Sequence, residues 1–546
     1  MLIGVICFRS LAPHSRRGSP ASRATWARQL LCVVALAGCA SGQSSQPDGP
    51  QQDHGTPAFP DGGPRWERSD ATAQDTGPAS SITVTFPTGG ESWPAGSSQS
   101  ITWSSTGAVG AVDIELWRAG SLHTSIAAGQ TNSGSHSWSI PADTPHGEDY
   151  TVRIVDPAAG VEHSSPAPFT ITNWRYRIKI TITSSQALTD HQVRVPLGPA
   201  VFDYSHACSN GADLRLAQGS TFTGTFNLPH WIESWSAGSN STVWVKIPSI
   251  PASGPTEVYL YYGQPTATDE SSLDQTFPNR FVSSGNLTLG GLQSHDWFEL
   301  KNGHSLTVKA GQALTITAPR LLLEGIVEGT GSGQVGGTSG AAGQGQGGGG
   351  GSTNSGGGGG GHGGKGGKGG HDSNDTPGNG GLTYGSTTNN AIEMGSGGGA
   401  GNNSAGGAGG GAVTLSGTQV VVKGTVRMDG AAGIGAGQSS GGGSGGGILI
   451  TADDLVLTGT CSVRGGAGGS GSITANDGGG GGGGGRIKIR YGQSLVNTVT
   501  LVTTGGAGGK YGDTAYGEAG LAGTLHSVKQ ATSPLTITLG PEEQVQ

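Results

Sequence analysis

The carboxy-terminal half of the chain repeats one short pattern of strand-forming residues. Three copies are LTITAPRLLLEGIVEGTG, VTLSGTQVVVKGTVRMDG and ILITADDLVLTGTCSVRG, which start at Leu314, Val413 and Ile448. Looser copies begin at Ile487 and Leu525. Apolar residues alternate with other residues inside each copy, which places them on one face of a strand. One copy cannot bury that face alone, so the copies must stack as in a solenoid.

The alignment of the copies predicts which side chains meet in the stack. When the copies are aligned on Gly325, Gly424 and Gly459, the matching apolar sets include Leu314/Val413/Ile448, Leu321/Val420/Leu455 and Val327/Val426/Cys461. We expect Val426 to point inward and Thr425 outward. Short strands from 282 onward would cap the first coil, and the tail after Lys529 is expected to be a loose end. The sequence therefore predicts a right-handed parallel β-helix over 282–530, with Gly-rich insertions leaving it once per turn.

These Gly-rich insertions have a pattern of their own. The chain holds 107 glycines, and residues 331–411 are nearly half Gly. Polyglycine can form an extended helix with three residues per turn, and such helices can pack side by side because no Cβ keeps their backbones apart. The non-Gly residues of one tract are spaced by three, at His362, Lys365, Lys368 and His371. This spacing predicts an ordered tract with these four side chains on one exposed edge, a possible surface contact strip. The alternative is a disordered low-complexity loop.

The amino terminus has the features of an export signal over residues 1–39. Arginines precede a short apolar run, which is too short to span a bilayer as a mature helix. The run ends in Leu36-Ala37-Gly38-Cys39, which resembles the bacterial lipobox. The resemblance implies that Cys39 carries a lipid, and Ala40 after it favours the outer membrane. An ordinary signal with a small-residue cleavage site is the alternative. Residues 40–80 are rich in Ser, Gln, Pro and Gly and predict a disordered tether.

Residues 81–172 contain short alternating strands separated by turn residues, which predict an antiparallel β-sandwich. The phrase PTGGESWPAG at 87–96 and the strands VDIEL and YTVRI resemble the Ser/Thr-rich module of fungal wall glycoproteins and bacterial surface proteins. That resemblance implies an immunoglobulin-like module without catalytic residues. Trp93, Trp103 and Trp138 are expected in its core, and a sugar-stacking platform is the alternative.

Residues 173–268 predict a second antiparallel sandwich. WRYR at 174–177, ADLRL, PHWIE, VWVKIP and VYLYYG occur in order and resemble the bacterial domain of unknown function 2341, which the resemblance places in exported, adhesin-like proteins. Within it, Trp231, Glu233 and Trp235 are candidate glycan contacts. The alternative is an ion pair of Glu233 with Arg175 or Arg177. The fold class expected is thus all-β: two antiparallel sandwiches followed by the β-helix.

Catalytic chemistry finds little support in the sequence. β-helix enzymes place carboxylates on one exposed strip, and the repeats offer only a few scattered acids: Glu324, Glu328, Asp429, Asp453 and Asp454. No metal-ligand spacing or phosphate-cradling loop is present, so we expect no enzyme, no metal and no cofactor. Cys208 and Cys461 are expected to be small buried residues rather than a disulfide. The net charge of −8, without a basic patch, argues against a nucleic-acid partner.

These observations predict an exported protein, lipid-anchored at the outer membrane or cell surface, with a structural or adhesive role and a displayed Gly-rich β-helix. Its expected partners are the membrane, through the lipid, and polysaccharide or other cell-surface components. A carbohydrate-binding surface protein is the alternative function, followed by a polysaccharide-acting enzyme.

Overall fold

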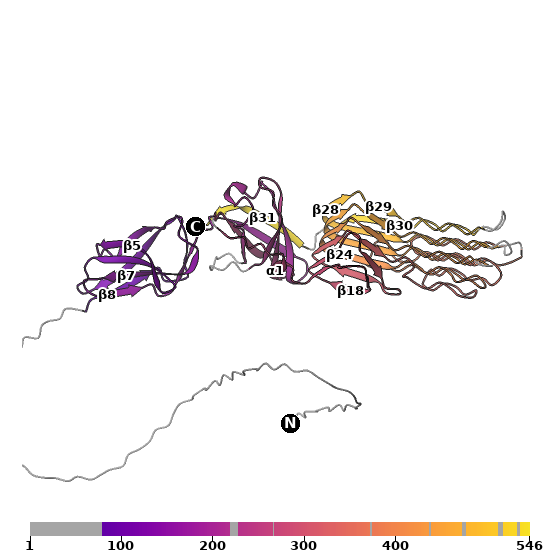
Figure 1. The fold of residues 1–546 in the computed structure, drawn as a ribbon, viewed down its shortest axis with the longest axis horizontal. Coiled ribbons are helices and arrows are strands. Elements are labelled where there is room, and N and C mark those ends of the chain that lie inside the picture. Colours follow the sequence, from indigo (N-terminus) through magenta and orange to yellow (C-terminus); the bar gives the residue numbers. More distant parts are fainter. Residues whose placement is uncertain are drawn as a thin grey trace, which may run out of the picture. The chain divides into compact units, whose positions relative to one another are not determined.

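The computed structural model describes residues 79–218, 228–265, 267–371, 374–435, 438–471, 477–510, 517–531 and 535–545. These residues belong to one compact unit. Their regular secondary structure consists almost entirely of β-strands (Figure 1). No helix in these ranges has the length and apolar character needed to cross a membrane. The predicted export signal, Cys39 and nearly all of the predicted tether lie outside the described residues.

The first domain is a sandwich of two sheets. One sheet has the order β1(Ser81–Phe86)-β3(Ser98–Thr106)-β6(Ser135–Ser139). The other has the order β2(Ser92–Pro94)-β9(Phe169–Thr172)-β7(Gly147–Asp156)-β4(Val112–Arg118)-β5(Ser121–Gln130), with β8(Val161–Ser164) on β7. Trp93, Trp103 and Trp138 are 4%, 4% and 5% exposed. They lie in the core between the sheets, as predicted, and not on a sugar-binding face.

The second domain is also a sandwich. Its first sheet has the order β12(Arg215–Gln218)-β15(Thr256–Tyr262)-β10(Tyr176–Ser184)-β31(Leu535–Gln544). Its second sheet has the order β11(Leu188–Leu197)-β14(Ser241–Ile250)-β13(His230–Ser234). A short 3₁₀ helix at Tyr204–His206 follows β11, and α1(Leu273–Thr276) follows β15.

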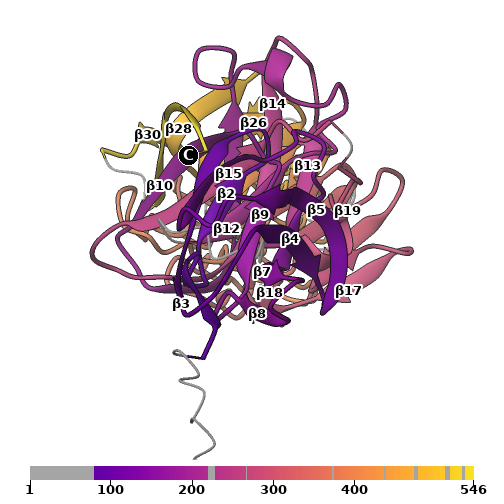
Figure 2. The ribbon, with the colours of Figure 1, turned by 90° about the vertical axis from the view of Figure 1, so that its left-hand side faces the viewer.

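The prediction of a loose tail after Lys529 is wrong. The terminal strand β31 pairs antiparallel with β10, and Leu535 enters the core of the second sandwich. Figure 2 shows the carboxy terminus beside β10 and β15. The second sandwich is therefore discontinuous in sequence: it needs the strands of the predicted 173–268 segment and the last strand of the chain.

Between β15 and β31 the chain forms parallel sheets. One contains β16(Arg280–Val282), β19(Trp297–Leu300), β22(Arg320–Leu323), β24(Ala412–Val422), β26(Gly447–Leu457), β28(Arg486–Asn497) and β30(Thr524–Lys529), with β18(Gly291–Ser294) and β21(Leu314–Thr317) beside them. The other contains β17(Leu287–Leu289), β20(Ser305–Val308), β23(Ile326–Glu328), β25(Thr425–Arg427), β27(Thr460–Ser462) and β29(Thr500–Val502). The short strands β16 to β20 occupy the predicted capping position.

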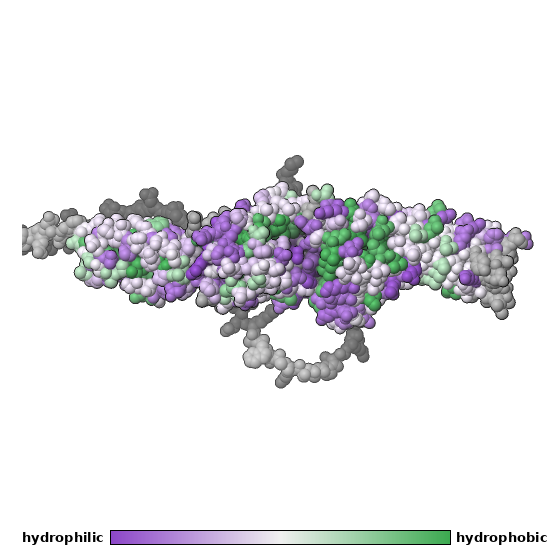
Figure 3. Space-filling model, turned by 90° about the horizontal axis from the view of Figure 1, so that it is seen from above, coloured by the Kyte–Doolittle hydropathy of each residue, from purple (hydrophilic) through white to green (hydrophobic). Residues whose placement is uncertain are grey.

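The strand register confirms the predicted alignment of the repeats. Leu314 pairs with Val413, which in turn pairs with Ile448. Val327 likewise pairs with Val426, which pairs with Cys461. All of these side chains are fully buried in one core shared by both sheets. The last strand of the larger sheet, β30, is less covered: Leu525 and Val528 are 50% and 37% exposed. A hydrophobic area over the parallel sheets is visible in Figure 3.

The Gly-rich tracts form a hydrogen-bonded array that continues from the parallel sheets (Figure 1). Within 356–361, successive amides donate to three different neighbouring tracts in rotation. Gly357 and Gly360 donate to Ser439 and Gly442, Gly358 and Gly361 donate to Gly350 and Gly347, and Gly356 and Gly359 donate to Gly370 and Gly367. This rotation is the signature of a backbone helix with three residues per turn. The array has the ordered packing that the sequence predicted.

Candidate functional site

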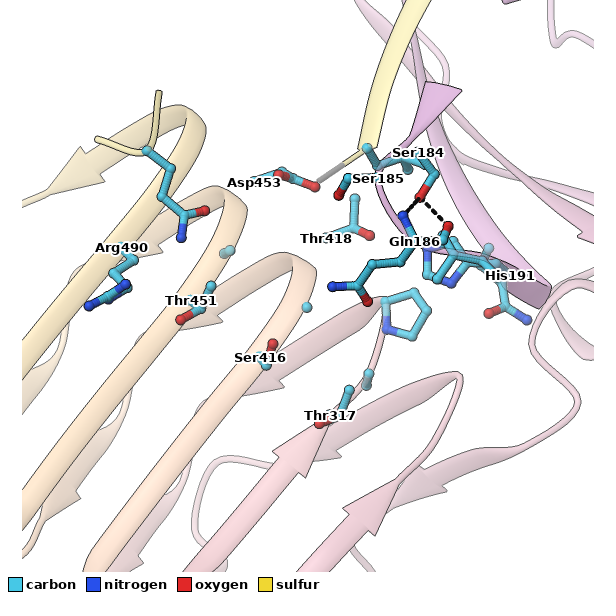
Figure 4. A pocket seen from close by; sticks show the side chains of 18 of the residues that line it. Ser184, Ser185, Gln186, His191, Thr317, Ser416, Thr418, Thr451, Asp453 and Arg490 are labelled. Atoms are coloured by element: carbon cyan, nitrogen blue, oxygen red, sulfur yellow. Dashed lines mark hydrogen bonds between the residues drawn. The ribbon is translucent and has the colours of Figure 1, made fainter. Parts of the chain in front are cut away.

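A groove runs along the corner of the coils, where the chain bends between β21 and β22 in one coil and within the long strands β24 and β26 in the next two. It has a cavity volume of about 960 Å³. The corners of successive coils form its floor, and the β10–β11 turn of the second sandwich forms one wall (Figure 4). The site therefore depends on both domains.

Small hydroxyl residues form a row on the groove floor. Thr317, Ser416 and Thr451 occupy the same register position in β21, β24 and β26. Neighbouring strands of a sheet lie about 4.8 Å apart, so the hydroxyls recur at that interval along the stack. Thr317 is exposed, and the other two are half-buried. In the next coil Arg490 takes this position.

The residues that follow this row have small side chains or none. Ala318 and Ala452 are buried, and Gly417 lies between them in the stack. A Cβ on Gly417 would stand 2.1 Å from the Ala318 carbonyl oxygen, which is closer than any real contact. Only glycine fits this corner, and no bulky side chain crosses the floor over these three coils.

The wall contributes polar groups on a short, self-bonded turn. The Ser184 hydroxyl donates to the Gln186 carbonyl at 2.6 Å, and the Gln186 amide donates to the Ser184 hydroxyl oxygen at 3.1 Å. In Figure 4 the Gln186 side chain extends toward the floor residues. Burial lowers the pKa of His191, further along the wall, to about 4. Its ring is therefore neutral near neutral pH.

Arg490 limits the groove at the end formed by β28. Its guanidinium donates to the backbone carbonyl of Asn389 at 2.8 Å and also bonds Asn390 and the Thr388 carbonyl. These acceptors lie in a segment that crosses the outer face of β28. Arg490 is thus held by the protein itself.

The predicted glycan contacts Trp231 and Glu233 lie elsewhere, in the junction between the second sandwich and the first coils. Trp231 packs against Trp297 of β19, with ring centroids 5.5 Å apart. Glu233 accepts hydrogen bonds from Trp244 at 2.8 Å and from Arg320 at 3.0 Å. The alternative prediction, an ion pair of Glu233 with Arg175 or Arg177, is therefore wrong. The partner of Glu233 comes from β22, which is too distant in the sequence for the pair to be predicted.

Trp235 does not join these two residues in one open platform. Its indole nitrogen donates to the Ser209 carbonyl at 2.8 Å, and its ring packs against Tyr204 and Phe202. A bulge between Ile232 and Ser234 interrupts the alternation that would have aligned the three side chains. The three predicted residues serve two different packing contacts.

The predicted contact strip is also corrected. His362 is fully buried. Its Nδ1 donates to the Gly445 carbonyl at 3.0 Å, and its ring stacks on Tyr384 at 4.7 Å. Lys365 and His371 are exposed, and Lys368 is half-buried. The spacing of three is present, but neighbouring tracts cover the His362 end, so the four residues do not share one open edge.

His362 faces Glu393, with Nε2 and Oε2 3.9 Å apart. The pKa of Glu393 is lowered, first by its interaction with the His362 side chain and further by the charge of Lys488. Burial lowers the pKa of Lys488, which lies on β28 and donates to the Ala391 carbonyl at 2.5 Å. Sequence reasoning missed this buried polar cluster because its members come from distant tracts.

The acidic residues of the repeats are mostly engaged in pairs. Glu324 binds Lys423 at 2.9 Å, Glu328 binds Arg427 at 3.0 Å, Asp454 binds Arg194 at 3.0 Å, and Asp429 accepts from the Arg464 amide at 2.7 Å. Asp453 is 6% exposed. Within the described ranges no three His, Cys, Asp or Glu residues gather as metal ligands. Both described cysteines are free, and burial raises the pKa of Cys461 to about 12.

Comparison with known proteins gives two family matches. Residues 86–171 match the Kre9/KNH-like N-terminal Ig-like domain, and residues 210–285 match a domain of unknown function (DUF2341). The second match overlaps the predicted 173–268 segment and extends past β16. Both predicted resemblances are confirmed, and the described chain is nearly all β with immunoglobulin-like sandwiches.

Among solved structures, the fibronectin(III)-like modules of Clostridium thermocellum CbhA match with 13% identity and a TM-score of 0.15. That match covers 34% of this chain and 89% of the other. No curated protein matches the chain in sequence.

Proposed function

We propose that this protein is a lipid-anchored, non-catalytic cell-surface protein with a structural and adhesive role. In this proposal the parallel-sheet region is a right-handed parallel β-helix, and the Gly-rich array is its stiff extension. Parallel sheets around one core support a β-helix, and right-handed crossovers are the rule for parallel strands. The Ig-like match supports a surface or carbohydrate-related setting.

The observation that carries the proposal is the return of the chain into the second sandwich. β31 pairs with β10 after the last coil, while Trp231 and Trp297 pack together at the first coils. The coils are therefore joined to the sandwich at both ends of their sequence. Such a joint transmits force, as an adhesive stalk requires.

Anchoring is tested first, by fractionating cells that produce the full chain. Cys39→Ser should remain unprocessed or leave the membrane fraction. Cys32→Ser, within the same apolar run, is the matched control and should behave as wild type. Normal maturation and membrane retention of Cys39→Ser would show that the anchor is wrong.

The adhesive role is tested by attachment under flow to polystyrene and to a layer of the parent cells. Cells lacking the gene should attach less, and wild type should restore attachment. Val426→Asp, which places a carboxylate in the buried core, should not restore it, whereas Thr425→Asp should. Equal attachment with and without the gene on both surfaces would refute adhesion.

A further inference from the structure

The corner groove has a floor that repeats along one direction. Thr317, Ser416 and Thr451 present one hydroxyl per coil at intervals of about 4.8 Å. A ligand that uses this row must be extended and must itself carry hydrogen-bonding groups at short, regular intervals. A compact ligand would contact one or two of the three hydroxyls.

The orientation of the strands excludes an added peptide strand as the occupant. β-augmentation requires the open edge of a strand, to which the peptide backbone binds. Here the row runs across successive strands, whose backbone groups already pair with one another in the sheet. The floor therefore offers side-chain hydroxyls rather than backbone groups.

Several charged groups around the groove are bound by other groups of the protein. Asp190 lies 3.4 Å from Lys246, and Arg490 is bound by carbonyl oxygens of the segment that crosses β28. Asp296 accepts from the Asn279 amide at 3.0 Å. His191 is neutral because burial lowers the pKa of its ring. The charged lining residues are of both signs, with Asp190, Asp296 and Asp453 against Arg490 and Lys529, so an ionic ligand meets like as well as opposite charge, and the lining favours a neutral ligand.

Polar and apolar surfaces alternate across the groove. The Gln186 side chain and the floor hydroxyls can donate and accept hydrogen bonds, while Leu188, Pro319 and Leu535 line the same space with apolar atoms. A sugar ring has the same division, with hydroxyl groups at its rim and C–H groups on its faces. The volume of about 960 Å³ is sufficient for several linked rings.

We propose that this groove binds a neutral, extended oligosaccharide that lies parallel to the stack of coils, across Thr317, Ser416 and Thr451. This inference rests on the proposed adhesive function and names the ligand class for it. The groove lacks an aromatic stacking platform among its lining residues, so each site binds weakly and many anchored copies act together.

Binding is measured by isothermal titration calorimetry on the full chain with Cys39→Ser for solubility. The probes are cellotetraose and chitotetraose, with tetragalacturonate as an anionic comparator. At least one neutral tetrasaccharide should bind, and tetragalacturonate should bind at least 10-fold more weakly. Failure of both neutral probes, or preference for the anionic one, overturns the proposal.

The position of the site is tested with variants that fill the floor. Ser416→Gln with Thr451→Gln should weaken binding of the neutral probe at least 10-fold. Thr425→Gln, on the smaller sheet, is the matched control and should leave binding unchanged. Equal binding by the floor variant and wild type, with both folded by circular dichroism, places the ligand elsewhere and overturns the proposal.

A second variant avoids the coils, in case the floor variant does not fold. Gln186→Ala shortens a side chain on the wall turn and should weaken the neutral probe several-fold, whereas unchanged binding contradicts the proposed site. The attachment assay separates this inference from the function on which it rests. If attachment survives the loss of oligosaccharide binding, the adhesive function holds and the groove is not its binding site. If the oligosaccharide binds but the cells do not attach, the groove is a binding site and the adhesive function is wrong.

Discussion

Tyr262 donates a hydrogen bond to Glu542, although 280 residues separate them in the sequence. Tyr262 ends β15, and Glu542 lies in β31, on the other side of β10. Glu542 also lies 2.9 Å from His206 through its other oxygen. The whole region of parallel sheets is therefore an insertion into one sheet of the second sandwich.

The terminal strand contributes a buried side chain to the second sandwich. Leu535 is 6% exposed in the sandwich core, whereas Thr536 beside it is exposed. Leu535→Asp should lower the free energy of unfolding by about 3 kcal/mol or more, because an unpaired carboxylate becomes buried. Thr536→Asp should have little effect. Urea denaturation compares the two, and equal midpoints would mean that β31 does not belong to the sheet.

The repeat core provides a second test. Val426 is fully buried, whereas Thr425 is half-buried on the other face of β25. Val426→Asp should cost several kcal/mol of stability, and Thr425→Asp much less. Thermal unfolding of the two variants checks the strand phase. Similar losses from both would show that the assigned faces are wrong.

The sequence predicted the repeat core because local alternation determines which face of a strand is buried. It could not predict the partner of β31, since LTITL at 535–539 has the same alternation as any edge strand. Pairing between β10 and β31 is determined by the tertiary contacts of Leu535 and of the acidic residues in the tail, and not by a local sequence pattern.

The groove was equally hidden, for a different reason. Thr317, Ser416 and Thr451 are ordinary turn-forming residues in sequence, and only their shared register makes them a row. Glu233 and Trp231 instead stood out as an aromatic-acid motif, although they serve the junction. Tracing the position three residues after Leu314, Val413 and Ile448 would have revealed the hydroxyl row.

Acid sensitivity should come in part from His230. Burial lowers the pKa of this ring from 6.5 to about 4. The folded chain therefore keeps it neutral where the unfolded chain binds a proton. Its contribution to stability is fully present above pH 6.5 and is lost as the pH falls toward 4.

His230→Phe should flatten the dependence of the urea midpoint on pH within that window. His123→Gln, at an exposed position in β5, is the control and should keep the wild-type slope. An unchanged slope in His230→Phe would contradict the assigned burial.

The junction pair is open to a double-mutant cycle. Arg320 and Glu233 have side chains 13% and 17% exposed, and Arg320 also lies 4.1 Å from the Trp297 ring centre. Arg320→Met and Glu233→Gln should show a coupling of about 1–3 kcal/mol in unfolding free energy. The more exposed pair Lys179–Glu257 should show less than about 1 kcal/mol. Equal coupling energies for the two pairs would mean that the junction pair stabilises the fold no more than the more exposed pair does.

The last prediction concerns the Gly-rich array, whose packing depends on the absence of side chains. A Cβ on Gly441 would lie 1.9 Å from the carbonyl oxygen of Gly358 in the neighbouring tract. Both groups are backbone, so neither can rotate away, and Gly441→Ala must push the two tracts apart. Hydrogen exchange of the wild type should show amides 356–361 protected by orders of magnitude over a random coil, because each donates to a neighbouring tract. Gly441→Ala should lose much of this protection, while Gly285→Ala, where a Cβ meets nothing within 4 Å, should keep it. Complete exchange of the wild-type tract within seconds would mean that the array does not form.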